Sequence, residues 1–285
     1  MLLAVHTSRQ IKKVEKFTPQ PLSRYVSSQN SPREIVVSLT SYGERLNTVH
    51  LAIKSVFMQS VRPNRIVLYL GKDCDNVELS SQLTELEKYG LEIRRGCEDL
   101  KPHKKYFYAL QEFPQSLVIT IDDDCVYKED FIETLIKGHK VFPDAVIARR
   151  VHRVEFDGNG QMLPYVEWTM EWKSSEITAA TSLVATGCGG ILYPAYLFSR
   201  EDFDLDMIRG IALSVDDLYL KIIELRKGIQ TVYVPNDLNM PYMISGTQKK
   251  ALCKRNVLEN GNDADLSKLL ERYGITASMF ISEDV

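Results

Sequence analysis

The sequence predicts an α/β fold, in which one mainly parallel sheet is covered by helices on both faces within a single domain. Short apolar runs rich in β-branched residues alternate with segments whose apolar residues recur at helical spacing. The runs are apolar on both faces, as strands are when helices cover both sides of a parallel sheet. The chain has 285 residues, 44% of them hydrophobic and 26% charged, which allows a large core and excludes a disordered chain.

The first half alternates strand and helix regularly. EIVVSL (34–39) is a β-branched run, and the helix after it has Val49, Ile53 and Phe57 on one face and ends before Pro63. Gly90 closes the second helix in the usual C-terminal position, and Pro102 opens the third. Expected strands are 34–39, 65–70, 91–94 and 117–121, and expected helices begin near residues 48, 79 and 102.

The second half is less regular. Expected strands are 145–149, 190–193 and 231–234, and helices are expected from residue 216 and over 264–273. We expect residues 1–32 to be a loosely attached extension, 33–125 and 126–245 to form two halves of the domain, and 246–285 to be a loop followed by a helix.

Charge and cysteine usage restrict the class of protein. The net charge is 35 − 38 = −3, whereas nucleic-acid binding usually requires a basic excess, so no nucleic-acid partner is expected. Five cysteines without a CxxC pair indicate a reducing, cytoplasmic environment. The uncharged stretch 177–199 is long enough to span a bilayer, but its polar residues, glycines and proline favour a buried strand and loop.

Three aspartates, Asp122, Asp123 and Asp124, follow the apolar run LVITI, at the strand end where open α/β sheets bind ligands. Adjacent carboxylates repel one another unless a cation neutralises them. Because alternate residues of an extended segment point the same way, Asp122 and Asp124 are expected to share one Mn²⁺ or Mg²⁺ ion, the hard cations that oxygen ligands suit. The structural alternative is an acidic cap on the next helix.

Two further charged clusters are candidates. The start of one helix is flanked by Lys101, His103, Lys104 and Lys105. Because the N-terminus of a helix already carries partial positive charge, these cations repel it, and an anion such as a diphosphate would relieve the repulsion. The alternative is that the lysines reach water. Asp216 and Asp217 open another helix, where they either complement its dipole or supply a general base.

Further candidate binding residues lie in the region 168–190. Trp168 and Trp172 are candidates for an aromatic platform under a sugar ring, although packing is the commoner fate of tryptophan. Gly189 and Gly190, in the segment TGCGG, indicate a close approach of the backbone or a tight turn.

The order of these motifs resembles the GT-A fold of nucleotide-sugar-dependent glycosyltransferases, especially the inverting family 2-like group. Ser55, Gln59 and Pro63 match the frame of its first helix, and Asp122–Asp124 match its DxD motif. Thr186–Gly190 is similar to its acceptor segment, and Asp216–Asp217 to its late acidic pair. The resemblance covers about 33–223.

The resemblance implies a Rossmann-like sheet and a metal-dependent, inverting transfer from a nucleotide-sugar donor, with UDP-sugars favoured. A saccharide or lipid-linked acceptor, glycan assembly and peripheral contact with the inner membrane face are implied as well. Asp217 would be the base, beside Asp216, and Asp122 and Asp124 the metal ligands. Donor-binding residues would be Thr40, Ser41, Tyr42, Arg45, Asp73, Lys104, Lys105, Asp122 and Asp123.

The sequence also departs from that family. The acidic pair usual after the second strand is replaced by Gly71-Lys72-Asp73, the QxxRW motif is absent, and no histidine follows His152. Two alternatives therefore stay open: a sugar nucleotidyltransferase, for which the phosphate loop is too poor in glycine, and a non-catalytic carbohydrate-binding protein.

Overall fold

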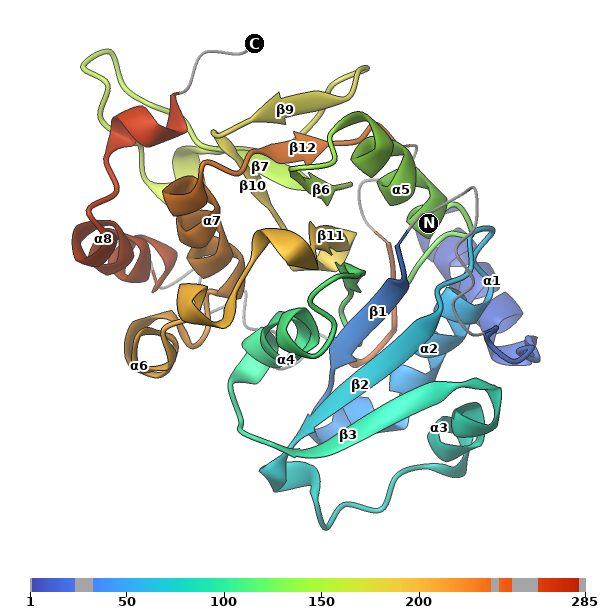
Figure 1. The fold of residues 1–285 in the computed structure, drawn as a ribbon. Coiled ribbons are helices and arrows are strands. Elements are labelled where there is room, and N and C mark those ends of the chain that lie inside the picture. The colour runs from blue at the N-terminus through green and yellow to red at the C-terminus, as the bar shows by residue number, and fades with distance from the viewer. Residues whose placement is uncertain (1, 24–32, 237–240, 248–260, 282–285) are drawn as a thin grey trace.

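The computed structural model describes residues 2–23, 33–236, 241–247 and 261–281. Most of the loop expected after residue 246 therefore lies outside the described residues. An eight-stranded sheet runs through the molecule in the order β3-β2-β1-β4-β11-β6-β12-β9 (Figure 1). Its strands are β1 (Ile35–Thr40), β2 (Arg65–Gly71), β3 (Leu91–Cys97), β4 (Leu117–Thr120), β6 (Val146–Ala148), β9 (Thr178–Ala180), β11 (Ile191–Pro194) and β12 (Thr231–Tyr233).

The sheet is mainly parallel, as the sequence predicts. β1, β2, β3 and β4 are parallel neighbours, and so are β6 and β12. β11 runs antiparallel between β4 and β6, and β9 runs antiparallel at the edge. Two small sheets flank this one: β10 (Leu183–Ala185), β7 (Val151–Arg153) and β8 (Thr169–Trp172) form the first, and β13 (Tyr242–Met243) with β5 (Cys125–Val126) the second.

Helices cover both faces of the sheet. In β1, Val36 joins the core beneath α4, α7 and α8, whereas its neighbour Val37 joins the core beneath α2, α3 and α5. This alternation is the two-sided burial that continuous apolar strands require. The helices are α1 (Leu2–Lys16), α2 (Val49–Phe57), α3 (Ser81–Thr84), α4 (Lys104–Glu112), α5 (Phe131–Val141), α6 (Leu205–Met207), α7 (Asp216–Lys227) and α8 (Gly261–Tyr273).

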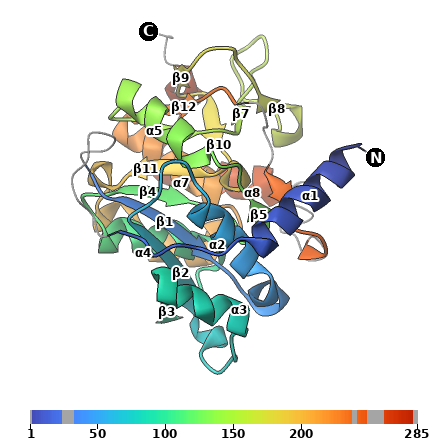
Figure 2. The same cartoon turned by 90° about the vertical axis from the view of Figure 1, so that its right-hand side faces the viewer.

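The N-terminal extension contains a helix that packs on the domain. Figure 2 shows α1 beside α2 and β5, with its first turns pointing away from the body. Val14 of α1 is buried with Leu51 and Tyr242, and the amide of Leu22 donates to the carbonyl of Tyr89 at 2.8 Å. The extension expected to be loose is therefore packed at these points.

The uncharged stretch 177–199 folds within the domain. It supplies β9, β10 and β11, as favoured over a membrane span. Within the described part of the chain, none of the helices combines the length and apolarity needed to cross a membrane.

Candidate functional site

The three aspartates lie where β4 ends beside β1. Strand β4 stops at Thr120, and Asp123 and Asp124 form a turn that leads into β5. The Tyr127 hydroxyl fixes this turn, because it accepts from the amide of Asp122 at 3.0 Å and donates to the carbonyl of Cys188 at 3.2 Å. The carboxyl end of β4 is thereby attached to the turn that precedes β11.

Arg45 binds two of the aspartates. Its guanidinium lies 2.7 Å from Asp123 and 3.0 Å from Asp124, and Ser41 donates to Asp123 at 2.6 Å. Burial raises the pKa of Asp123 to about 6, and the charge of Arg45 and the Ser41 hydrogen bond limit the rise. Ser41, Arg45 and Asp123, all predicted donor-site residues, therefore form one group.

Asp122 pairs with a different cation. The Lys105 ammonium lies 2.8 Å from Asp122 and 3.1 Å from Asp216. Burial opposes the charge of Lys105, but Asp122, Asp216 and Asp217 outweigh it and raise its pKa well above the usual value. Lys105, at the start of α4, thus joins the end of β4 to the start of α7.

Asp217 is held by backbone. The amide of Gly187 donates to both carboxylate oxygens of Asp217 at 3.1 Å. Burial, and next the charge of Asp216, raise the pKa of Asp217 to about 8, while Lys105 and the Gly187 amide act against the rise. A carboxyl group with this pKa exchanges protons near neutral pH, as a general base requires.

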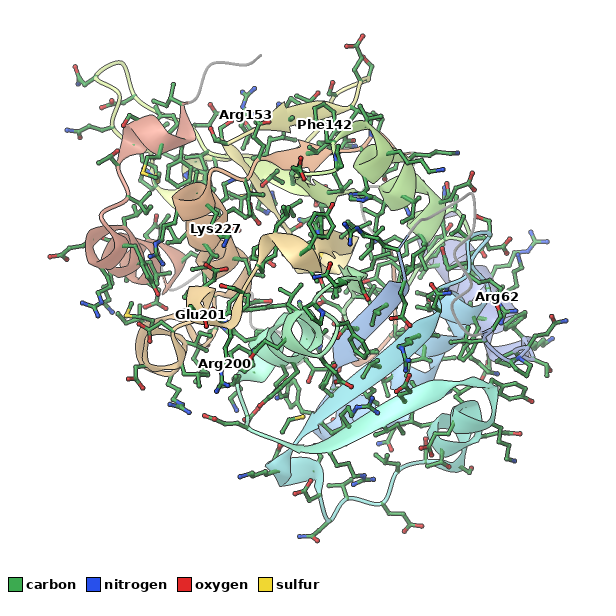
Figure 3. The ribbon with its side chains drawn as sticks, viewed as in Figure 1. Arg62, Phe142, Arg153, Arg200, Glu201 and Lys227 are labelled. Atoms are coloured by element: carbon green, nitrogen blue, oxygen red, sulfur yellow. The ribbon has the colours of Figure 1, made fainter. Side chains whose placement is uncertain are left out.

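Gly187 leaves room at the centre of the site. A β-carbon on it would lie 2.6 Å from Lys105 Nζ and 3.4 Å from Oδ1 of both Asp122 and Asp217. Asp122 and Asp217 therefore border the same small space, although 95 positions of sequence separate them. Figure 3 draws the side chains on the ribbon, with Lys227 of α7 labelled at the left of the view and Arg62 labelled at the right.

The remaining predicted donor-binding residues contact different parts of the structure. Thr40 donates to the carbonyl of Tyr69 at 2.8 Å, and the Tyr42 side chain is exposed beside Arg45. Lys104 does not face the aspartates of β4 but pairs with Asp99 at 2.5 Å. Asp73 lies close to Asp99, since a β-carbon on Gly71 would approach both.

His103 belongs to the core rather than to a ligand cluster. It is buried, and its ring nitrogens lie 2.5 Å from the Tyr106 hydroxyl and 2.7 Å from the carbonyl of Ala212. These contacts hold the start of α4 against the segment before α7, so His103 supports the position of Lys105.

The predicted acceptor residues are mostly packed. Trp168 is 4% exposed, and its indole N–H donates to the carbonyl of Leu163 at 2.9 Å. Trp172 is partly buried against Tyr233. β-Carbons on Gly189 and Gly190 would lie 2.4 Å from Arg150 and 2.3 Å from Phe131, so close packing accounts for both glycines.

The sequence did not reveal the network around Arg150. Its guanidinium donates to Thr186 at 2.7 Å and to Glu171 at 3.0 Å. Glu171 has a φ of 49°, a left-handed conformation that is rare outside glycine, and its amide donates to His152 at 2.9 Å. The sequence signals available were the basic residues Arg149, Arg150, His152 and Arg153 and the segment TGCGG, neither of which identifies the partner.

The chemistry of the site suits a hard cation. Asp122 and Asp124, the expected metal ligands, pair with different cations: Asp122 with Lys105, and Asp124 with Arg45. No group of three His, Cys, Asp or Glu side chains that could hold a metal occurs among the described residues. Asp122, Asp123, Asp124 and Asp216 outnumber Lys105 and Arg45, and this excess of negative charge favours a divalent ion among oxygen ligands.

Comparisons with known proteins establish the fold. No protein-family model and no curated protein matches the sequence. Among solved structures, the chain is similar to mannosyltransferase PcManGT from Pyrobaculum calidifontis in complex with GDP-Man and Mn²⁺, with a TM-score of 0.51 and 12% sequence identity over 99% of this chain and 73% of the other. The chain thus shares a mixed α/β fold, built on a mainly parallel Rossmann-like sheet, with this protein, which confirms the predicted fold class.

Proposed function

We propose that the protein transfers a sugar from a nucleotide-diphosphate donor to a hydroxyl group of a saccharide or glycolipid acceptor, with inversion at the anomeric carbon, in glycan assembly. The observation that carries the proposal is the single space bordered by Asp122, at the end of β4, and Asp217, at the start of α7. A transferase needs a donor-side carboxylate and an acceptor-side base within reach of one reacting carbon.

The reaction assigns Asp217 the role of base. The acceptor oxygen attacks the anomeric carbon, its proton passes to a carboxylate oxygen of Asp217, and the bond to the diphosphate breaks with its electron pair leaving on the nucleotide. The Gly187 amide holds both carboxylate oxygens, so the base has a fixed direction. Asp216 keeps Lys105 beside Asp217 through its 3.1 Å ion pair.

The donor would lie over the ends of β1 and β4. Ser41, Arg45 and Asp123 already form one group there, beside the exposed ring of Tyr42. A Mn²⁺ or Mg²⁺ ion near Asp122 and Asp124 would supply positive charge to the departing diphosphate. UDP-sugars are the donors that we favour from the sequence, and GDP-mannose is the donor bound by the similar mannosyltransferase.

Nucleotide binding is the first test. UDP, GDP, CDP and ADP are added with and without Mn²⁺ to the wild type and to Asp122→Asn, and melting is followed. A ligand at a hundred times its Kd stabilises by about 2.7 kcal/mol. One diphosphate that stabilises the wild type far more than the variant supports the proposal, and no shift with any of the four overturns it.

Product analysis is the second test. The selected nucleotide-sugar is incubated with candidate acceptors, and the anomeric configuration of the product is read by proton NMR. Inversion is expected, and a product with retained configuration would contradict the role of Asp217. Pyrophosphate release from a nucleoside triphosphate and a sugar phosphate would indicate a nucleotidyltransferase instead.

A further inference from the structure

Lys105 occupies the position in which the carboxylates of the site need a cation. Its ammonium contacts Asp122 at 2.8 Å and Asp216 at 3.1 Å, and the Asp217 carboxyl group is a third acidic group near it. The Lys105 side chain is 7% exposed, so water does little to screen these charges. The backbone of Lys105 is held as well, because the Ser38 hydroxyl of β1 donates to its carbonyl at 2.5 Å.

The neighbouring lysine shows that this arrangement is specific to Lys105. Lys104 is also buried, with a side chain 3% exposed, but its ammonium pairs with Asp99 at 2.5 Å on the other side of the helix start. Lys101 pairs with the same Asp99 at 2.7 Å. Two adjacent lysines of equal charge and similar burial thus serve different carboxylates, and Lys104 is a matched control.

A buried ammonium between two carboxylates competes with any other cation for them. We propose that Lys105 is a tethered cation whose ammonium is paired with Asp122 before the donor binds. When the donor binds, its diphosphate pairs with this ammonium in place of Asp122. A divalent ion can therefore bind Asp122 only together with the diphosphate. Lys105 therefore exchanges one anionic partner for another and remains paired throughout.

This exchange has a structural basis in Gly187. A β-carbon there would lie 2.6 Å from Lys105 Nζ, on the side bordered by Asp122 and Asp217, so the glycine leaves room for the ammonium. A flexible four-carbon side chain can move its charge into that space without movement of α4. The diphosphate step depends on the proposed function, whereas competition between Lys105 and a divalent ion does not.

The competition is tested with Mn²⁺ alone. Free Mn²⁺ is measured by EPR as MnCl₂ is titrated into the wild type, Lys105→Met and Lys104→Met, without nucleotide. Removal of the tethered charge leaves Asp122 and Asp216 without their shared cation, so Lys105→Met should bind Mn²⁺ at least about tenfold more tightly than the wild type. Lys104→Met should bind it as the wild type does.

The transfer to the diphosphate is tested without metal. UDP and GDP are titrated by calorimetry in the presence of a chelator. Lys105→Met should lose at least about tenfold in affinity for the diphosphate that the wild type binds, and Lys104→Met should lose much less. If no protein binds either diphosphate, the proposed function fails, while the Mn²⁺ titration still decides the role of the lysine.

Two results would overturn the proposal. One is equal Mn²⁺ affinity of the wild type and Lys105→Met. The other is tight, saturable Mn²⁺ binding by the wild type that Asp122→Asn abolishes, since Lys105 would then not exclude the ion. The second measurement needs no Lys105 variant and decides the matter even where Lys105→Met fails to fold.

Discussion

The amide nitrogen of Gly187 lies 3.1 Å from each carboxylate oxygen of Asp217. One peptide group thereby orients the side chain of the second residue of α7, and the turn that carries this peptide group is attached to Asp122 through Tyr127 and Cys188. The donor-side aspartate and the proposed base are thus held by the same short turn. Changes in this turn should act on catalysis before they act on folding.

The first prediction concerns Asp217 itself. Asp217→Asn preserves shape and can still accept the Gly187 hydrogen bond, but it cannot take a proton from the acceptor. We expect kcat to fall by about 10²- to 10⁴-fold, the usual contribution of a general base. Steady-state turnover is the measurement, and the exposed Asp206→Asn is the control. Near-normal turnover of Asp217→Asn beside an inactive Asp122→Asn would exclude Asp217 as the base.

The second prediction is a pH dependence of stability. The pKa of Asp217 is about 8 in the folded protein and about 3.9 in an unfolded chain, so between these values the folded state retains a proton that the unfolded state loses. The contribution of Asp217 to stability therefore falls as pH rises from about 4 to 8. Asp217→Asn removes this loss. The melting temperature of the variant should therefore increase relative to that of the wild type as pH is raised from 5 to 9.

A carboxylate with the opposite shift provides the control. Despite its partial burial, the pKa of Asp202 is lowered, because Lys227 and the Ser199 backbone stabilise its charge. Asp202→Asn should therefore lower the melting temperature by a nearly constant amount between pH 5 and 9. If Asp217→Asn also shifts the melting temperature by a constant amount over this range, Asp217 is ionised in the folded protein at neutral pH.

The third prediction separates catalytic from structural glycines. A β-carbon on Gly187 would meet the end of Lys105 and approach Asp122 and Asp217, so Gly187→Ala should lower kcat at least about tenfold with a smaller loss of stability. A β-carbon on Gly138 would instead lie 2.6 Å from Val234 and 2.7 Å from Ile147, so Gly138→Ala should mainly destabilise the fold.

Turnover and urea unfolding of both variants, with Gly158→Ala as a control, check this contrast. A β-carbon on Gly158 has no atom within 4 Å, so that variant should retain both activity and stability. Equal loss of activity in Gly138→Ala and Gly187→Ala, in proportion to stability, would show that Gly187 has only a packing role.

Much of the fold could be predicted from the sequence, because strands such as β1 and β4 bury both faces and appear as continuous apolar runs. β5, β7, β8 and β13 could not be predicted in the same way, because they are two to four residues long and their pairing depends on distant segments. The antiparallel position of β11 between β4 and β6 is likewise a long-range property.

The residues of the site could be predicted individually, but their ion-pair and hydrogen-bond partners could not. The positions of Asp122 at a strand end and Asp217 at a helix start are local properties, and the sequence indicates both. The partner of each charge is not local: Lys104 and Lys105 are adjacent and look equivalent, yet the helix geometry turns one to Asp99 and the other to Asp122. Asp122 and Asp124 likewise pair with different cations, Lys105 and Arg45, and strand alternation does not indicate these partners.

The last prediction concerns Arg45, which holds two buried carboxylates with a side chain that is 18% exposed. Arg45→Met leaves Asp123 and Asp124 without this cation, and breaking a buried ion pair from one side costs about 3 kcal/mol or more. Urea unfolding should show this loss, whereas Arg209→Met, which breaks an exposed pair with Glu98, should cost much less.

The loss should also depend on pH in a defined direction. Burial already raises the pKa of Asp123 to about 6 with Arg45 present, and removal of the guanidinium raises it further. In the variant, the Asp123 carboxyl group is therefore neutral at pH 5, and its burial costs little stability. As pH approaches 8, this group must either ionise without Arg45 or retain a proton that the unfolded state loses, and both lower the free energy of unfolding. Arg45→Met should consequently be closer to wild-type stability at pH 5 than at pH 8. A deficit that is equal at both values, or no larger than that of Arg209→Met, would show that Arg45 does not stabilise the charged form of the aspartate turn.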